Sequence, residues 1–185
     1  IERLFWRNSA ENAVSIDAVW VYGSTGTTRC GIDRRRKGRA KMDYKSFVEQ
    51  QILSIRETVG DGLAINALSG GVDSSVVTVL GHRALGDRLK TVFIDNALMR
   101  EGEPQQVMHA MADMCIPVEV VDARRDFLQA LAGVTDPEAK RNAVTQTFYK
   151  KVFGDLVRQS GAKYLLHGTI LTDIEETVAG IKRQH

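Results

Sequence analysis

Apolar and polar residues follow two different spacings along the chain, and these predict a regular series of strands and helices from residue 43 onward. Short apolar runs, typical of buried strands, occur at residues 63–68, 89–94, 118–121 and 164–166. Elsewhere apolar residues recur every three or four positions, which indicates helices at residues 44–59, 75–85, 103–114, 127–132 and 137–160. This alternation is typical of βαβ units, so we predict an α/β fold with a mostly parallel, doubly wound sheet and helices on both faces.

The first 42 residues do not continue this pattern, and we expect them to form a small N-terminal extension or β subdomain. Residues 18–22 predict one short strand, which ends at a turn containing glycine and serine. The chain is therefore divided into an extension at residues 1–42 and a main domain at residues 43–185.

The composition is typical of a soluble globular protein, with 43% hydrophobic and 26% charged residues. No run approaches the roughly 18 apolar residues of a membrane span and no cleavable signal pattern opens the chain, so we expect no membrane partner. Cys30 and Cys115 form neither a CxxC pair nor a disulfide framework, which favours a reducing, cytoplasmic location. We interpret Cys115 as a small buried apolar residue.

The net charge of +2 conceals an uneven distribution. Residues 1–42 carry nine Lys/Arg and four Asp/Glu, whereas residues 43–185 carry sixteen and nineteen. Most of the excess lies in six basic residues of segment 29–41: Arg34, Arg35, Arg36, Lys37, Arg39 and Lys41. A solvated loop is the simplest interpretation, and an anion site or an RNA-binding arm is the alternative. Because no aromatic residues lie between these cations, we do not expect a nucleic-acid partner.

Polar segments follow three of the predicted strands directly, at residues 69–71, 95–96 and 168–169. In a parallel α/β sheet the ligand binds beyond the carboxyl ends of the strands. These three segments are therefore expected to line one cleft.

The first of these segments opens the motif SGGVDSS, which joins a strand to a helix. Its members are Ser69, Gly70, Gly71, Val72, Asp73, Ser74 and Ser75. Adjacent glycines bring the backbone close to a ligand, successive N–H groups bind an anion at the helix start, and serine hydroxyls donate to phosphate oxygens. Asp73 is suited to hold Mg²⁺. No lysine follows the glycines, so this is not a Walker loop. The alternative is a serine-capped helix that binds no ligand, and the position of the motif between a strand and a helix disfavours it.

The motif resembles the pyrophosphate-binding loop of the N-type ATP pyrophosphatases, or PP-loop proteins. Further segments resemble the ATP-pyrophosphatase domain of GMP synthetase, in that family's order: residues 93–103, 126–141, 168–176 and 181–185. The resemblance implies a fold of the adenine nucleotide alpha-hydrolase kind. It also implies that ATP is cleaved between its α and β phosphates, that XMP (xanthosine monophosphate) is adenylated with release of pyrophosphate, and that amination then gives GMP.

The resemblance also assigns roles to residues. Ser69 to Ser75 would hold the β and γ phosphates, while Ile94 and Gly168 would border the nucleotide. Three carboxylates would contact Mg²⁺: Asp73, Asp173 and Glu176. Asp73 and Lys182 would be the catalytic residues, with Lys182 neutralising charge as pyrophosphate leaves. Spacing alone would equally allow an exposed helix start at residues 173–176 and a solvated surface lysine at residue 182.

The chain departs from the family pattern in segments that line the cleft. Residues 143–146 lack an expected arginine, and Ala97, His167 and Gln184 replace a glycine, a glutamine and a histidine. These changes affect the expectation that XMP is the acceptor more than the expectation that ATP binds. The alternatives are therefore a PP-loop paralogue with another acceptor, such as a tRNA sulfur transferase, and a non-catalytic nucleotide-binding module.

Two larger parts of the family are expected to lie elsewhere. Cys30 does not sit in the nucleophile motif of a glutaminase, so ammonia would come from solution or from a separate glutaminase subunit. The family's C-terminal dimerisation domain is not recognised in the chain, and a homodimer is expected for the full-length protein.

Overall fold

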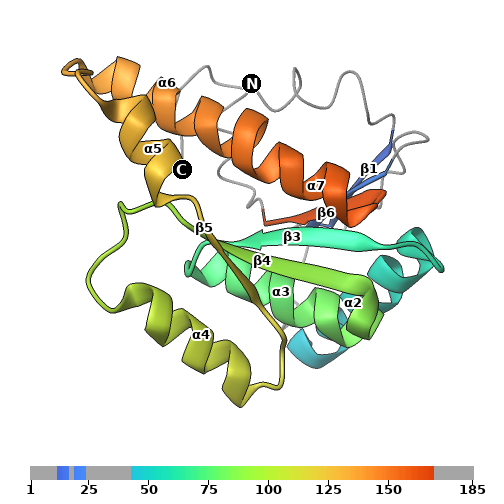
Figure 1. The fold of residues 1–185 in the computed structure, drawn as a ribbon. Coiled ribbons are helices and arrows are strands. Elements are labelled where there is room, and N and C mark those ends of the chain that lie inside the picture. Colours follow the sequence, from blue (N-terminus) through green and yellow to red (C-terminus); the bar gives the residue numbers. More distant parts are fainter. Residues whose placement is uncertain (1–11, 17–18, 24–42, 169–185) are drawn as a thin grey trace, which may run out of the picture.

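A computed structural model of the chain describes residues 12–16, 19–23 and 43–168 (Figure 1). Six strands form one sheet in the order β1-β2-β6-β3-β4-β5. The strands are β1 (Asn12–Ile16), β2 (Val19–Gly23), β3 (Ala64–Leu68), β4 (Leu89–Asp95), β5 (Glu119–Asp122) and β6 (Tyr164–His167). β3 to β6 pair in parallel, whereas β1 pairs with β2, and β2 with β6, in the antiparallel sense. The mostly parallel sheet predicted from the sequence is confirmed.

Helices cover both faces of this sheet, as predicted. They are α2 (Tyr44–Val59), α3 (Val72–Leu85), α4 (Glu103–Asp113), α5 (Arg124–Leu131), α6 (Pro137–Gln146) and α7 (Gly154–Ser160). Figure 1 shows α2, α3 and α4 on one face and α5, α6 and α7 on the other. The crossovers from β3 to β4 and from β4 to β5 thus use one face, and the return to β6 uses the opposite face, which makes the sheet doubly wound.

The predicted strand at residues 18–22 is present as β2. It is accompanied by β1, which the apolar pattern does not predict. Both strands extend the main sheet, with Trp20 opposite His167 on β6. The division of the chain at residue 42 stays a prediction, and the basic segment 29–41 lies outside the described residues.

Capping residues explain where several helices begin. The Asp43 carboxylate accepts hydrogen bonds from the N–H groups of Lys45 and Ser46, and the Asp136 carboxylate accepts one from Ala139 N. The helix predicted at residues 137–160 is present, but a π-helical stretch, Thr147–Phe153, separates α6 from α7.

Three predictions about local structure are wrong. Helix α5 covers Arg124–Leu131 and not residues 127–132, because its N-cap is Ala123 and the charged residues after it are already helical. Helix α3 begins at Val72 and not at Ser75, because Gly71 is its extended N-cap and the polar residues after it already have helical conformation. Cys115 is exposed and not buried. It occupies the turn after α4 with a left-handed φ of 56°, and the next residue, Ile116, takes the buried position instead.

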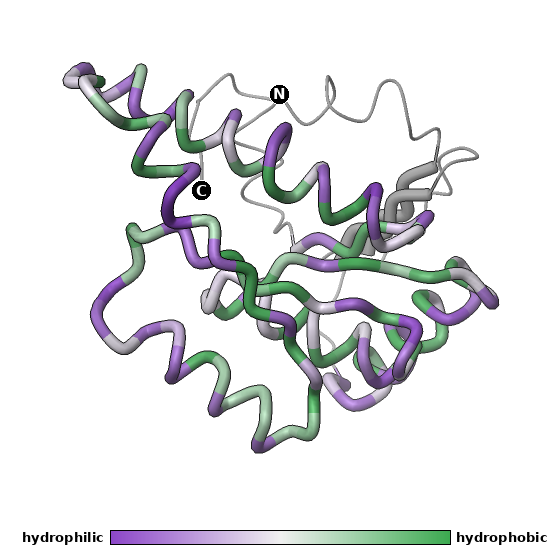
Figure 2. Tube along the Cα trace, viewed as in Figure 1, coloured by the Kyte–Doolittle hydropathy of each residue, from purple (hydrophilic) through white to green (hydrophobic). Residues whose placement is uncertain are grey.

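The core forms two layers, one on each side of the sheet. On the α3 side, Leu80 and Leu85 pack with Leu89 and Leu166, and on the other side Phe127 and Phe153 lie among residues that include Ile65 and Val92; all are at most 6% exposed. Figure 2 shows hydrophobic residues along β3 and β4 through the centre of the molecule. Within the described part of the chain, none of the helices combines the length and the apolar character needed to cross a membrane.

Candidate functional site

The SGGVDSS motif lies at the middle of the carboxyl edge of the parallel sheet. It follows β3, which is flanked by β6 and β4. Gly168, which follows β6, lies against it: a Cβ on Gly168 would be 3.2 Å from the carbonyl carbon and oxygen of Asp73. Asp95 ends the strand on the other side. The segments after these three strands therefore meet at one edge, as the sequence predicts.

Gly70 has a backbone position that requires glycine. Its φ is +83°, and a Cβ there would lie 2.9 Å from Val107 Cγ2 on α4. Gly71 differs, because its φ is −74° and the nearest atom to an added Cβ is Ser69 Oγ at 3.5 Å. The first glycine is thus needed to shape the loop, whereas a Cβ at the second would make only an ordinary contact with Ser69 Oγ.

The serine hydroxyls hold the loop in shape. Ser74 Oγ accepts a hydrogen bond from Ser69 N at 3.2 Å, lies 2.9 Å from Ser69 Oγ, and donates to the Gly71 carbonyl at 3.1 Å. Ser75 Oγ donates to the same carbonyl at 2.8 Å. These contacts tie the end of β3 to the first turn of α3, so the loop is stabilised by its own side chains.

The backbone N–H groups of Val72, Asp73 and Ser74 are left to face outward. They are the first donors of α3, and within the described part of the chain they have no acceptor. Such groups bind anions, because the partial positive charge at the helix N-terminus adds to the hydrogen bonds. The arrangement can therefore hold phosphate oxygens.

Asp73 fits the requirements of a metal ligand. Its side chain is exposed, and it makes no hydrogen bond or ion pair with any residue that the structure describes. A carboxylate oxygen beside bound phosphates is the kind of ligand that Mg²⁺ prefers. Asp173, Glu176 and Lys182 lie outside the described residues, and among those described there is no cluster of three or more potential metal ligands.

The side chain of Ile94, which is predicted to border the nucleotide, does not face the loop. Its side chain is 4% exposed and packs in the core beneath α5. Ile94 lies one residue beyond the last β3–β4 pair, Leu68 and Phe93, so its backbone lies beside the loop. Only main-chain groups of Ile94 can therefore face a ligand.

Glu103, which the sequence pattern does not assign to the site, lies beside the loop. Its Oε2 accepts a hydrogen bond from Arg100 N at 2.9 Å, and its Oε1 lies 3.9 Å from the position of a Cβ on Gly70. The carboxylate thus orders the turn before α4 next to the phosphate loop. Its position at the end of the family-like segment 93–103 is the signal that could have identified it.

The turn after β4 is built by two side chains that bond to the backbone ahead of them. Asp95 Oδ1 accepts a hydrogen bond from Ala97 N at 3.0 Å, and Asn96 Oδ1 accepts one from Leu98 N at 2.9 Å. Ala97 consequently has a left-handed φ of 62°. This is the position where the chain replaces the family's glycine, so the alanine carries backbone strain there.

An arginine joins two carboxylates at the neighbouring ends of β4 and β5. Arg124 contacts both oxygens of Asp122, at 2.9 and 2.6 Å, and its Nε lies 3.7 Å from Asp95 Oδ2. The hydrogen bonds from Arg124 lower the pKa of Asp122 to about 2 from its ordinary value of 3.8. Asp122 in turn raises the pKa of Arg124.

Solved structures identify the class of fold. The chain resembles the NH3-dependent NAD synthetase of Campylobacter jejuni, solved with nitrate, at a TM-score of 0.56 and 18% identity over 65% of this chain and 55% of that one. It also resembles the glutamine-dependent NAD+ synthetase of Acinetobacter baumannii, solved with ADP, at a TM-score of 0.54 and 16% identity over 68% of this chain and 26% of that one. This likeness shows that the chain has the α/β fold of these two synthetases.

Sequence comparison is more specific. The chain is 51% identical over 144 residues to one subunit of the glutamine-hydrolyzing GMP synthase of Archaeoglobus fulgidus, which is 78% of this chain and 46% of the relative. It is 47% identical over 145 residues to the corresponding subunit of Pyrococcus horikoshii, 78% of this chain and 47% of the relative. It is 44% identical over 151 residues to the GMP synthase of Nitratiruptor sp., 81% of this chain and 28% of that one. No family model matches the chain.

These matches give the chain its family. The matched part is a PP-loop domain of the GMP synthetase type or of a close paralogue. The chain spans about half the length of the Archaeoglobus and Pyrococcus relatives.

The strain at Ala97 generates a first prediction. Ala97→Gly should raise the free energy of unfolding by about 1 kcal/mol, because glycine adopts a positive φ without the clash of a Cβ. Ala110→Gly, on the exposed side of α4, is the matched control and should lower it by about 1 kcal/mol. Urea denaturation measures both. A destabilised Ala97→Gly variant would show that the alanine at this turn is unstrained.

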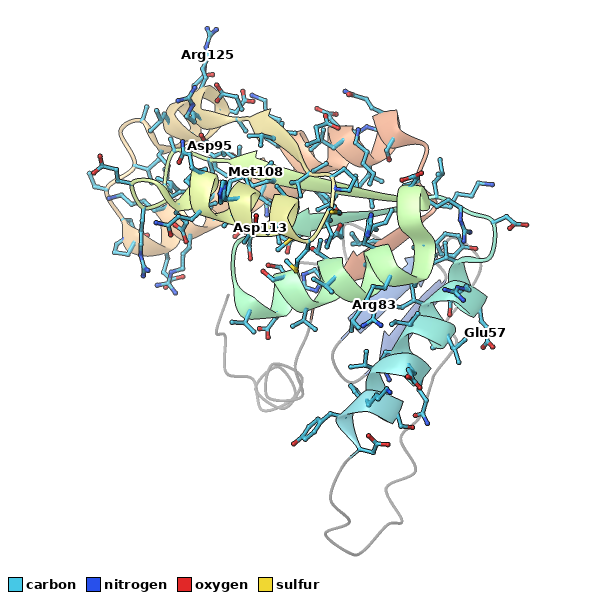
Figure 3. All side chains as sticks on the ribbon, turned by 90° about the horizontal axis from the view of Figure 1, so that it is seen from below. Glu57, Arg83, Asp95, Met108, Asp113 and Arg125 are labelled. Carbon is cyan, nitrogen blue, oxygen red and sulfur yellow. The ribbon has the colours of Figure 1, made fainter. Side chains whose placement is uncertain are left out.

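The Asp122–Arg124 pair generates a second prediction. Because the folded pKa of Asp122 is depressed, its stabilising contribution is present above the ordinary value of 3.8 and is lost as the pH falls towards about 2. Arg124→Ala should raise the pKa of the Asp122 carboxyl towards its ordinary value, measured by NMR titration, because only the hydrogen bond from the backbone N–H of residue 124 is then left. Arg125→Ala is the control, since Arg125 points into solvent (Figure 3). An equal pKa in all three proteins would contradict the assignment.

Proposed function

We propose that the chain is the ATP-cleaving part of an enzyme that adenylates XMP, releases pyrophosphate and aminates the adenylate to GMP. The observation that carries the proposal is the 51% identity over 144 residues to a GMP synthase subunit. In a chain of 185 residues, a continuous match of that length must include residues 42–144 wherever it starts. The whole SGGVDSS motif lies within that range.

The geometry of the loop supports binding of the β and γ phosphates of ATP. The outward N–H groups at the start of α3 and the exposed backbone of Gly71 suit phosphate oxygens. Main-chain groups of Ile94 and Gly168 are proposed to border the nucleotide. The free carboxylate of Asp73 is proposed to hold Mg²⁺, together with Asp173 and Glu176. The metal would neutralise charge on the phosphates, and Lys182 would assist as pyrophosphate leaves.

The nitrogen for the second step is proposed to come from a separate glutaminase subunit. The Archaeoglobus and Pyrococcus relatives are each named as one subunit of a glutamine-hydrolyzing synthase, which supports such a partner. We further propose a homodimer for the full-length protein and a cytoplasmic location.

Sulfur transfer is the less supported alternative within the PP-loop class. It requires a reactive cysteine near the loop, but Cys115 follows α4 and precedes β5, at the opposite edge of the sheet. Cys30 lies outside the described residues.

A third prediction tests the reaction itself. The complete gene product, incubated with MgATP, XMP and ammonium, should form AMP and pyrophosphate in ³¹P NMR spectra only when XMP is present. Formation of ADP and phosphate would refute cleavage between the α and β phosphates. If ATP stays intact with XMP but is cleaved when another nucleotide or tRNA is added, that molecule is the acceptor instead of XMP. Asp73→Asn should lower turnover by about 100-fold without unfolding the protein.

The two glycines of the loop supply a fourth prediction. Gly71→Ala should leave stability nearly unchanged, since its φ suits alanine and the nearest contact is 3.5 Å, but should weaken MgATP binding by at least about tenfold by filling the phosphate space. Gly70→Ala should destabilise the protein itself by about 1–2 kcal/mol. Calorimetry measures affinity and denaturation measures stability. Unchanged affinity in Gly71→Ala would place the phosphates elsewhere.

A further inference from the structure

Three polar side chains lie buried between the sheet and α3, where the surrounding residues are apolar. Asn66 on β3 is 1% exposed, Thr78 on α3 is 0% exposed and Thr91 on β4 is 3% exposed. Their neighbours on this face of the sheet include Val77, Leu80 and other residues of the core. Polar groups in such surroundings are costly unless each of them has a hydrogen-bond partner.

The three side chains satisfy one another in a continuous chain of hydrogen bonds. Thr91 Oγ1 donates to Asn66 Oδ1 at 2.8 Å, and Asn66 Nδ2 donates to Thr78 Oγ1 at 2.6 Å. Thr78 Oγ1 then donates to the Ser74 carbonyl at 2.7 Å. The direction is fixed by chemistry: an amide nitrogen can only donate, so the hydroxyl hydrogen of Thr78 is directed to Ser74.

This chain ends in the SGGVDSS motif. Ser74 is the residue whose hydroxyl contacts Ser69 N, Ser69 Oγ and the Gly71 carbonyl. A bond from a threonine to the carbonyl four residues earlier is common in helices, where the hydroxyl can rotate away. Here Asn66 holds the hydroxyl in one orientation, and fully satisfied buried networks make a core rigid.

We propose that Thr78, oriented by Asn66, is a positioning residue for phosphate binding. Its bond to the Ser74 carbonyl fixes the first turn of α3, so that the N–H groups of residues 72–74 and the Asp73 carboxylate are held ready for the ligand. The ordering of the turn follows from the structure, whereas its effect on ATP affinity rests on the proposed function.

The test compares two substitutions that each remove one buried hydroxyl. Thr78→Val breaks the bond to Ser74, whereas Thr91→Val removes the far end of the network and leaves that bond in place. Both should lower stability, because each leaves a polar group of Asn66 without its partner. Only Thr78→Val should speed amide hydrogen exchange at Ser75, whose N–H is bonded to the Gly71 carbonyl at 3.1 Å in the first turn of α3, in the nucleotide-free chain. Only this variant should also weaken MgATP binding, by about five- to tenfold. Thr91→Val should change both by less than about twofold.

Two further variants keep the test decisive. Thr78→Ser retains the hydroxyl and should restore both slow exchange and affinity. Thr78→Ala is a second hydroxyl-free variant, to be used if the valine variant does not fold. In the alanine variant, water in the vacated space can pair with Asn66.

The exchange measurement separates this proposal from the proposed function. Equal exchange at Ser75 in the Thr78 and Thr91 variants, or an unchanged rate in both hydroxyl-free Thr78 variants, overturns the positioning role. Faster exchange confined to the Thr78 variants with unaltered MgATP affinity limits Thr78 to a structural role and likewise overturns it. Faster exchange in a protein whose wild type binds no MgATP supports the ordering of the turn and refutes the proposed function instead.

Discussion

Parallel pairing of β3 on both of its sides is the constraint on which the rest of the molecule depends. β4 lies on one side of β3 and β6 on the other. The chain must therefore cross one face of the sheet to reach β4 and the opposite face to return to β6. The two crossovers separate beyond the carboxyl end of β3, and the glycine loop begins directly after Leu68 at that point. The position of the site is thus a consequence of strand order.

Within the site, different groups shape the loop and face the ligand. Ser69, Ser74 and Ser75 use their hydroxyls within the loop itself, and the buried network behind Ser74 supports the same turn from the core. The backbone N–H groups and the Asp73 carboxylate face outward without such contacts. A site arranged in this way needs little reorganisation when an anion arrives, which favours binding.

The sequence predicts the parts of this structure that depend on neighbours along the chain. Strands covered on both faces are continuous apolar runs, so β3, β4 and β6 and the loop after β3 could be recognised. The exposed edge strand β5 could be recognised from its valines alone. The pairing of β1 with β2, the helical conformation from Val72 and the exposure of Cys115 depend on register and turn geometry, which periodicity does not report. The contact between Asn66 and Thr78 requires knowing which residues of two elements meet in space.

The place of β5 at the end of the sheet affects the solubility of the protein. β5 is short, and Val120 at its middle is 49% exposed, so this edge could attract a strand from another molecule. Charged residues occupy both of its ends: Glu119 is paired with Lys90 at 2.8 Å, and Asp122 is paired with Arg124. A second copy approaching edge to edge would have to desolvate these ion pairs. The acidic residues at the two ends of β5, which are also the ends of its pairing with β4, therefore protect the strand against aggregation.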